Sequence, residues 1–324
     1  MTSIMSEQAL MERIDELRVQ ADAVILAHNY QPPWVKKLAD FCGDSLQLSR
    51  LAATHPRSTI VFCGVEFMAE SAKLLSPSKR VLLPASGAGC SLADSISAAE
   101  LAQWRSGYPD AIVVAYVNTS AAVKALSDVC CTSANAVEIV NEIPRDRTVL
   151  FLPDIFLGSY VAERTQHPSL KLWMGECHVH AGISSANLEE RIANDPDAEL
   201  YIHPECGCTS EALYRASEVP GATIRLLSTT QMIDEAKKTK SRHVLVATEV
   251  GILSDLMAVN PITRFEAVNP LARCPYMNLV TPDSLVDALE NGVGEVSIDS
   301  SIAERAAAPL LAMLDPGLRP WRFQ

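Results

Sequence analysis

Residues 63–75, CGVEFMAESAKLL, follow the short apolar run TIVF, and this arrangement occurs three times along the chain. Two later stretches are built in the same way: LPDIFLGSYVAER (152–164) after TVLF, and ATEVGILSDLM (247–257) after HVLV. An apolar run of strand length followed by a segment of helical length is typical of a buried parallel strand and its crossover helix. The three copies therefore predict an internal repeat.

Three further sets of positions recur at nearly the same spacing. Strands that stop in a polar tip reach that tip at His28, Tyr116 and His203, which are 88 and 87 residues apart. Hydroxyl residues that could cap a following helix stand at Ser45, Ser133 and Thr229. Cysteines follow weaker apolar runs at Cys90, Cys177 and Cys274. The hydroxyl positions are 88 and 96 residues apart, which indicates an insertion in the third copy between His203 and Thr229.

We therefore predict an α/β fold of three tandem homologous α/β/α domains with parallel sheets, arranged with pseudo-three-fold symmetry around a central active site. A chain of 324 residues is long for a single core, which agrees with several domains. The predicted domains are 1–107 with an N-terminal helix and Cys90, 108–192 with Cys177, and 193–324 with Cys274 and a C-terminal tail. Ligands of such sheets bind beyond the carboxyl ends of the strands, where the polar tips would meet.

Composition and charge narrow the class of protein. Hydrophobic residues make up 48% and charged residues 20%, as in a globular protein with an ample core. The opening MTSIMSEQALMERIDELRVQ reads as an amphipathic helix, without the apolar core of a signal peptide or membrane span, so we expect a cytoplasmic protein. A net charge of −12 argues against binding nucleic acid or anionic membranes. Any anionic substrate must therefore be held by local groups.

The cysteine count argues against a disulfide framework, because nine is odd and the spacings are irregular. Cys90, Cys177 and Cys274 could meet at the centre, one from each repeat, and three thiolates suit an iron–sulfur cluster or zinc. Structural zinc usually needs a fourth ligand and Cys-x-x-Cys loops, which this chain lacks. A [4Fe–4S] cluster with three cysteines leaves one iron open as a Lewis acid. Three unrelated buried thiols are the alternative.

The other cysteines have simpler explanations. Four lie in or at the ends of strand runs, where core packing accounts for them: Cys42, Cys63, Cys130 and Cys131. Cys206 and Cys208 form a Cys-x-Cys pair beside His203, for which a second metal or redox feature is an alternative to plain burial.

The polar tips carry residues suited to proton transfer. Each tip has two such positions, spaced i and i+2 so that both side chains point the same way: His28 and Tyr30, Tyr116 and Asn118, His203 and Glu205. Histidine, tyrosine and glutamate can transfer protons, whereas asparagine orients and donates. A structural role in loops is the alternative. The hydroxyl positions, together with helix N-termini, could hold a carboxylate or phosphate, so we expect a small anionic substrate.

A series of motifs resembles the quinolinate synthase family. It runs in order from about residue 24 to about residue 285 and comprises AHNYQ, GDSLQLS, CGVEFMAE, GCSLAD, YVNTSAAVKA, CTSANAV, FLPD, GECHVH, HPEC, STTQM, ATEVGIL and CPYM. The resemblance implies an enzyme that condenses iminoaspartate with dihydroxyacetone phosphate to quinolinate, phosphate and water for NAD synthesis. It also implies a [4Fe–4S] cluster and a partner, an aspartate-oxidising enzyme, that supplies iminoaspartate.

The resemblance also assigns residues. The implied cluster ligands are Cys90, Cys177 and Cys274. The implied substrate contacts are His28, Ser45, Tyr116, Val117, Asn118, Ser133, His203, Pro204, Glu205 and Thr229. Tyr30 and Glu205 resemble the acid–base residues, and His203 and Tyr116 join them as catalytic positions. His178 and His180 in GECHVH are interpreted as supports of the ligands or as structural residues.

Three rival functions use the same observations. An open-iron hydro-lyase acting on a small polycarboxylate would need no phosphate site. A non-enzymatic electron carrier or iron–sulfur sensor would need a fourth cysteine ligand and an exposed cluster. A zinc-stabilised structural protein would hold zinc instead of iron.

Overall fold

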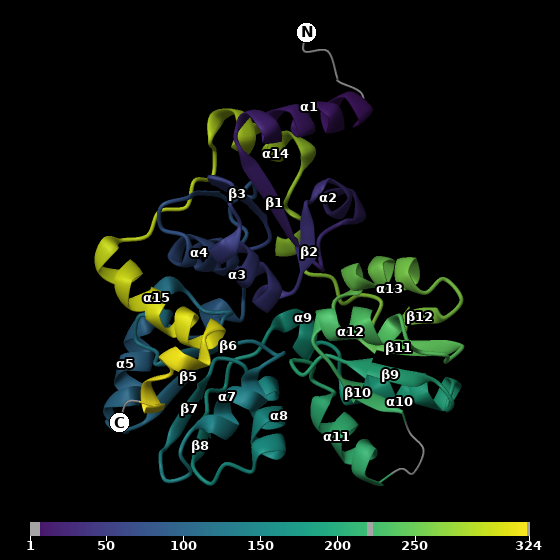
Figure 1. Cartoon of the computed structure of the whole chain (residues 1–324). Coiled ribbons are helices and arrows are strands. Elements are labelled where there is room, and N and C mark those ends of the chain that lie inside the picture. The colour runs from purple at the N-terminus through teal and green to yellow at the C-terminus, as the bar shows by residue number, and fades with distance from the viewer. Residues whose placement is uncertain (1–6, 219–222, 323–324) are drawn as a thin grey trace.

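The computed structural model describes residues 7–218 and 223–322, and its strands form three parallel four-stranded sheets (Figure 1). In each sheet the strands lie in the order second, first, third, fourth. The first sheet contains β1 (Ala23–His28), β2 (Phe41–Gly43), β3 (Thr59–Cys63) and β4 (Arg80–Leu82). The second contains β5 (Ile112–Tyr116), β6 (Val129–Cys131), β7 (Val149–Leu152) and β8 (Leu170–Leu172). The third contains β9 (Glu199–Ile202), β10 (Ile224–Leu226), β11 (His243–Ala247) and β12 (Arg264–Ala267). The shared strand order confirms the predicted fold class of three similar α/β units.

Helices connect the strands as crossovers. The first unit has α2 (Pro33–Leu38), α3 (Ser45–Thr54) and α4 (Glu66–Leu75). The second has α6 (Ala121–Lys124), α7 (Ala136–Glu142) and α8 (Ile155–Thr165), preceded by α5 (Ala98–Ser106). The third has α11 (Thr209–Glu218), α12 (Thr229–Ala236) and α13 (Leu253–Val259), preceded by α9 (His178–Ala181) and α10 (Ser185–Asn194). Short 3₁₀ turns lie at η1 (Ala93–Ser95), η2 (Val250–Ile252), η3 (Tyr276–Asn278), η4 (Pro316–Leu318) and η5 (Pro320–Arg322).

The inner strands are apolar because helices cover both faces of each sheet. Every residue of β1, β3, β5, β7 and β9 is buried. Such strands show a continuous apolar run instead of an alternating one, which is why the sequence pattern identified them. The first strand of each sheet ends where its polar tip was predicted, at His28, at Tyr116 and just before His203. The extra length of the third copy lies partly in α11, which is longer than its counterparts α2 and α6.

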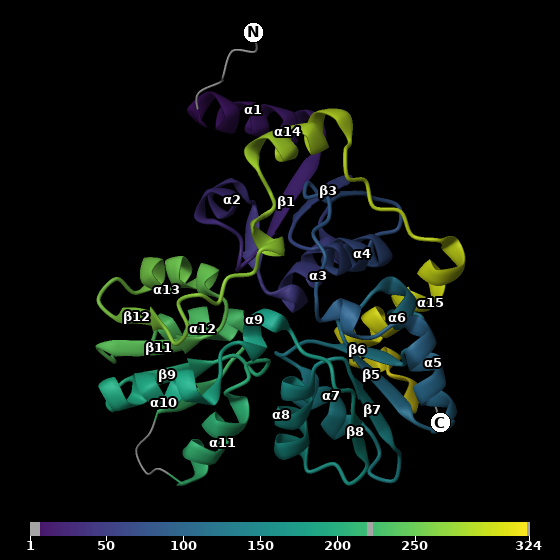
Figure 2. The ribbon, with the colours of Figure 1, turned by 180° about the vertical axis from the view of Figure 1, so that it is seen from behind.

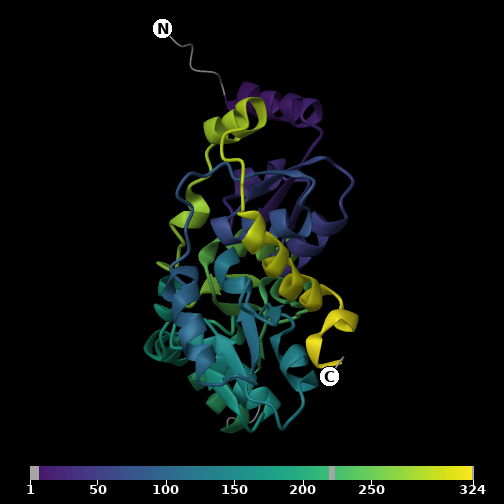
Figure 3. The same ribbon diagram turned by 90° about the vertical axis from the view of Figure 1, so that its left-hand side faces the viewer.

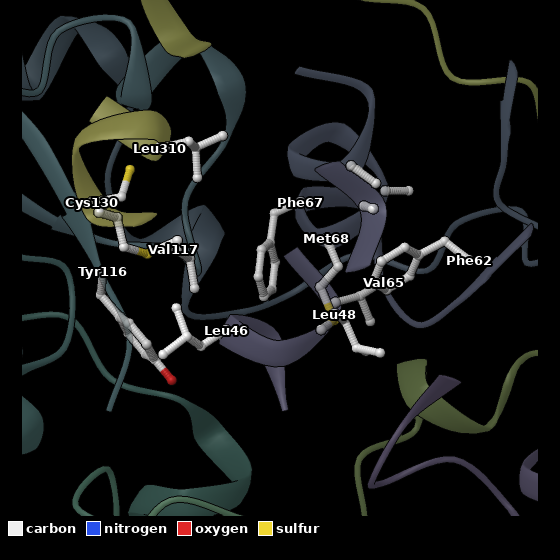
Figure 4. Close-up of a cluster of buried hydrophobic side chains, with 14 of the residues drawn as sticks. Leu46, Leu48, Phe62, Val65, Phe67, Met68, Tyr116, Val117, Cys130 and Leu310 are labelled. Atoms are coloured by element: carbon white, nitrogen blue, oxygen red, sulfur yellow. The ribbon is translucent and has the colours of Figure 1, made fainter. Parts of the chain in front are cut away.

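The three units meet at the centre of the molecule, with α9 close to the meeting point (Figures 1 and 2). Buried side chains of the first and second units form one continuous apolar cluster. Phe67 of α4 and Leu46 of α3 face Tyr116 and Val117 of the second unit, with Leu310 near them (Figure 4). The junction between these units is therefore a packed core, which holds their strand tips in fixed positions.

The sequence pattern grouped residues 193–324 as the third repeat with its C-terminal tail. In the structure the tail packs on the first and second units instead. Helix α14 (Pro282–Asn291) lies against α1 (Glu7–Gln20), and α15 (Ser300–Leu314) packs on α6 and β6 (Figure 3). The physical reason is the apolar face of α15, whose Ala306, Leu310 and Met313 are buried in the core shared by the first two units. The tail thus covers the first and second units.

The described part of the predicted N-terminal helix is α1, and residues 1–6 lie outside the described residues. Within the residues that the structure describes, no helix combines the length and apolar character needed to cross a membrane.

Candidate active site

A central cavity opens where the strand tips of the three units converge. The cavity and its mouth together enclose about 750 Å³. Its lining brings together the predicted residues of all three repeats: His28, Tyr30, Ser45, Cys90, Tyr116, Asn118, Ser133, Cys177, His203, Glu205, Thr229 and Cys274. Positions almost 90 residues apart in the sequence are thus neighbours in space, because the carboxyl-terminal edges of the three separate sheets meet at this cavity.

Two residues of the predicted set do not line the cavity, Val117 and Pro204. Each stands between the two cavity residues of its tip, and alternate side chains of an extended segment point to opposite sides. The Val117 side chain is buried beside Phe67 (Figure 4), and its carbonyl accepts a hydrogen bond from Lys124. The carbonyl of Pro204 accepts from Thr209. Both residues shape the backbone that carries the tips.

The prediction that Ser45, Ser133 and Thr229 cap helices is wrong. Asp44 caps α3 by accepting from the N–H of Gln47, and Ser228 caps α12 by accepting from the N–H of Gln231. Ser45 and Thr229 are instead the first helical residues, so their hydroxyls are not used as caps. The two caps also contact each other, because Ser228 Oγ donates to Asp44 Oδ2 over 3.2 Å. This bond ties the first unit to the third beside the cavity.

Ser133 and Thr229 have partners that hold their hydroxyls at the cavity wall. Ser133 Oγ lies 3.2 Å from Nε2 of His203. Thr229 Oγ1 accepts from Nδ2 of Asn29 over 2.9 Å. Both contacts cross between units, so these hydroxyls are positioned by tertiary structure.

The three candidate cluster cysteines share a local structure. Each sulfur accepts hydrogen bonds from the backbone N–H groups two and three positions later, in the pairs Leu92 and Ala93, Val179 and His180, and Tyr276 and Met277. Each cysteine also stands just before a helical turn, namely η1, α9 or η3. Burial raises the pKa of all three thiols, and the N–H groups act in the opposite direction by favouring the thiolate, the form that binds metal. The same turn has therefore been built once in each unit around a cysteine that faces the cavity.

The spacing of these sulfurs distinguishes between kinds of metal centre. Among the described residues, one set of possible metal-binding atoms lies within 4.8 Å of one another, and it comes from His180, His203 and Glu205. The sulfurs of the three cysteines do not form such a set. Ligands of one tetrahedral zinc ion lie roughly 3.8 Å apart, since each Zn–S bond is about 2.3 Å. A multi-iron cluster bridges a wider set of sulfurs. In this arrangement the three sulfurs are not grouped closely enough to share one tetrahedral zinc ion.

The remaining cysteines are core residues, as predicted, with one exception. Cys63, Cys130, Cys131, Cys206 and Cys208 are fully buried and do not line the cavity. Cys206 Sγ donates to the carbonyl of Ala247 over 3.1 Å, so the Cys-x-Cys pair is part of the core of the third unit. Cys42, predicted as a packing residue, is exposed because β2 is an edge strand.

Glu205 is the most perturbed acid of the cavity. It is 3% exposed, and burial raises its pKa to about 7 while a hydrogen bond from Tyr116 acts in the opposite direction. Tyr116 Oη donates to Glu205 Oε1. Burial and the nearby Glu205 raise the pKa of Tyr116 well above its usual value, so the phenol keeps its proton. A carboxyl group whose pKa is near neutral can both take and return a proton under working conditions.

Tyr30 belongs to a second hydrogen-bonded group, which includes a histidine that the sequence analysis treated as a support. Tyr30 Oη lies 2.5 Å from Thr248 Oγ1 and 3.2 Å from His180 Nε2. The other ring nitrogen of His180 is 3.4 Å from Cys177 Sγ. His180 thus connects a candidate cluster ligand to a candidate proton donor. The His-x-His spacing directly after Cys177 was the available signal for this residue.

Three buried histidines of the cavity, His28, His180 and His203, are uncharged near neutral pH. Burial lowers the pKa of His28 to about 3 and that of His180 to about 4, and burial and neighbouring histidines lower the pKa of His203 well below its usual value. The 3.6 Å separations of His180 and His203 from Glu205 are therefore contacts of neutral rings and not ion pairs. These imidazoles can orient a ligand and exchange hydrogen bonds, but they do not hold an anion by charge.

Glu249 is a lining residue that the sequence analysis missed. Its Oε1 accepts from the N–H of Cys274 over 3.1 Å, and its Oε2 accepts from the N–H of Gly251 over 2.6 Å. The carboxylate thereby fastens the turn that carries Cys274 to the end of β11. The only sequence signal for Glu249 was its position in a strand-tip motif: ATEVG places a glutamate after its strand, as HPEC does after the neighbouring strand.

Comparison with known proteins assigns the family. The model of the family described as Quinolinate synthetase A protein matches residues 12–315. A quinolinate synthase of Mycolicibacterium paratuberculosis is 52% identical over 311 residues, covering 95% of this chain and 88% of the relative. Quinolinate synthases of Mycobacterium sp. (strain KMS) and Mycobacterium tuberculosis (strain H37Rv) are each 51% identical, covering 94% and 95% of this chain and 91% and 88% of the relatives. Three similar parallel-sheet units, a shared cavity with one cysteine from each unit, and these matches show that the chain belongs to the quinolinate synthetase A family of enzymes.

Proposed function

We propose that this protein condenses iminoaspartate with dihydroxyacetone phosphate and releases phosphate and water, supplying quinolinate for NAD biosynthesis. The observation that carries the proposal is the cavity itself, where a cysteine from each unit, a buried carboxyl group and three hydroxyls converge. An aspartate-oxidising enzyme is the partner that would supply the unstable imine. Because all nine cysteines are free thiols in the described residues, we also propose a reducing compartment, the cytoplasm.

Cys90, Cys177 and Cys274 would hold a [4Fe–4S] cluster, whose open iron supplies Lewis-acid chemistry to a bound substrate when the cluster is present. The three matching N–H turns support this assignment, because at each cysteine the N–H groups partly offset the burial that raises the pKa of the thiol. Glu249 and His180 contact the turns of Cys274 and Cys177, and so hold two of the ligands in place.

Glu205 and Tyr30 would move the protons. The condensation needs a base that removes a proton next to a carbonyl group and an acid that protonates a departing hydroxyl group. Glu205, with a pKa of about 7, can serve as that base. Burial raises the pKa of Tyr30 well above its usual value, so its phenol keeps its proton, and Tyr30 would act as a hydrogen-bond donor or acid and not as a phenolate. His180 and Thr248 fix the direction of the Tyr30 hydroxyl.

The anionic groups of the substrates would be held by hydroxyl groups and backbone dipoles. Ser45 and Thr229 stand at the N-termini of α3 and α12, where the helix dipole favours negative charge. Because the buried histidines His28, His180 and His203 are neutral, these hydroxyls and Ser133 are the anion-binding groups of choice. The acidic character of the whole protein, with a net charge of −12, makes such local binding necessary.

The decisive experiment is anaerobic purification with iron and sulfide counted, followed by an assay that measures quinolinate and phosphate together. We expect about four irons and four sulfides per chain, as a [4Fe–4S] centre requires, and equal amounts of quinolinate and phosphate. Turnover without phosphate release would point to the hydro-lyase. A cluster spectrum that no substrate shifts would favour the electron carrier, and zinc in place of iron would favour the structural protein.

Replacing Thr229 with alanine is expected to raise the KM for dihydroxyacetone phosphate by about ten- to one-hundred-fold. A hydrogen bond to a charged group contributes about 1.5–3 kcal/mol, and each 1.4 kcal/mol is a factor of ten. The matched control is Thr230→Ala, because Thr230 is the next residue of α12 and bonds to Gln47 outside the cavity. Steady-state kinetics with the iron content verified provide the measurement. Equal KM values for the two variants would remove Thr229 from the substrate site.

A further inference from the structure

The residues just after the three candidate cluster cysteines contact one another. Ser91 follows Cys90, His178 follows Cys177, and Tyr276 comes two positions after Cys274. Ser91 Oγ lies 2.6 Å from Nδ1 of His178 and also accepts from the backbone N–H of His178 over 3.4 Å. The rings of His178 and Tyr276 meet edge to face, with centroids 6.3 Å apart and planes at 85°. We call Ser91, His178 and Tyr276 the clasp.

The clasp lies at the outer end of the cavity. All three residues belong to its lining, yet His178 is exposed and Ser91 and Tyr276 are half-buried. The residues assigned to proton transfer, Tyr30 and Glu205, are buried deeper in the same lining. The clasp therefore stands between the cysteines and the solvent.

The contacts of the clasp join three turns that lie far apart in the sequence. Cys90, Cys177 and Cys274 come from three units, and 87 and 97 residues separate them. Glu249 anchors the turn of Cys274 within the third unit, since its carboxylate accepts hydrogen bonds from the N–H groups of Cys274 and Gly251. The Ser91–His178 bond and the His178–Tyr276 contact are side-chain links from one cysteine turn to the next. His178 is the central member, since it contacts both of the others.

We propose that Ser91, His178 and Tyr276 are positioning residues that hold the three cysteine turns together and so retain the iron–sulfur centre against loss to solvent. This inference rests on the proposed function, because it needs the cluster. Release of the centre requires the three turns to separate, and contacts between them lower the population of such open states. Removing the His178 imidazole breaks both side-chain links and leaves only the 3.4 Å bond from the backbone N–H of residue 178 to Ser91. Removing the Ser91 hydroxyl breaks its bonds to His178 but leaves the contact of His178 with Tyr276.

The test measures iron release from the anaerobically loaded holoenzyme. Bathophenanthroline disulfonate forms a coloured complex with released iron, so its absorbance reports the rate without any assay of activity. We expect His178→Ala to release iron about five- to tenfold faster than the wild type, and Ser91→Ala about threefold faster, because each lost link contributes a modest free energy. His178→Asn, which can keep a hydrogen bond to Ser91, should release iron more slowly than His178→Ala.

His55→Ala is the matched control. His55 makes an edge-to-face contact with Phe41 at 5.7 Å, comparable to that of His178 with Tyr276, but it lies outside the cavity lining. We expect it to leave the release rate unchanged. The thermal midpoint of His178→Ala should match that of His55→Ala, so that a faster release cannot be explained by general loss of stability.

The outcomes separate this inference from the proposed function. A wild type that binds no iron and sulfide would overturn both. If the wild type binds the cluster but releases iron as fast as His178→Ala does, the inference alone is overturned. The same holds if His55→Ala speeds iron release as much as His178→Ala does. If His178→Ala takes up no cluster at all, the rate of iron release from Ser91→Ala decides. A release rate equal to that of the wild type would contradict the proposal that the clasp retains the cluster.

Discussion

A Cys177→Ser enzyme is expected to lose the proposed iron–sulfur centre and with it at least about 10³-fold in turnover. Lewis-acid stabilisation contributes several kcal/mol, and each 1.36 kcal/mol is a factor of ten in rate. Cys90→Ser and Cys274→Ser should behave in the same way, because each cysteine is the single ligand from its unit. Iron and sulfide counts, the absorbance of the cluster and the rate of quinolinate formation are the measurements.

Two other cysteines provide the comparison. Cys42→Ser changes an exposed thiol on an edge strand, so cluster content and rate should both stay at the wild-type level. Cys206→Ser changes a buried thiol close to Glu205 but outside the cavity lining, and the cluster should survive. If Cys206→Ser lost the cluster while Cys177→Ser kept it, the assignment of the ligands would be wrong.

Glu205→Gln is expected to lower turnover by about 10²- to 10⁴-fold, the usual contribution of general acid–base catalysis, while the cluster remains. Glutamine keeps the shape and can still accept the hydrogen bond of Tyr116, but it cannot take a proton. A matched control is Glu211→Gln on α11 of the same unit, where Glu211 pairs with Arg215 away from the cavity. A Glu205→Gln enzyme with wild-type turnover would exclude Glu205 as the base.

The pH dependence gives this prediction a second measurement. Tyr116, His180 and His203 face Glu205, and burial raises the pKa of the carboxyl group to about 7. Since the base must be ionised, kcat/KM of the wild type should rise as pH increases through about 7, and the residual activity of Glu205→Gln should lack this rise. Unfolding should show the linked effect. Between pH 4.5, the ordinary pKa of a glutamate, and about pH 7 the native state binds more protons than the unfolded state. The free energy of unfolding of the wild type should therefore fall as pH rises through this range, and that of Glu205→Gln should fall less.

The pattern along the chain predicted most of the scaffold. Fully buried strands produce continuous apolar runs, and this signal located the central strands and their tips at His28, Tyr116 and His203. The common spacing of the cysteines predicted that Cys90, Cys177 and Cys274 would reach one cavity, as they do. Motif resemblance added the family, which the comparisons confirm.

Contacts between units were beyond the reach of such patterns. Asp44 and Ser228 act as the caps next to the predicted hydroxyls, and a polar residue one position away gives almost the same local signal. The link of His180 to Tyr30, the contact of Ser133 with His203 and the packing of α15 on the second unit join residues far apart in sequence.

The amino-acid order alone determined the repeat, the parallel strands, the polar strand ends and the residue types available for chemistry, because each is expressed in local periodicity and spacing. Tertiary structure alone decided which side chains face the cavity, the raised pKa of Glu205 and the joining of the three cysteine turns. These depend on burial and on distances between units, and both arise only when the three sheets pack against each other.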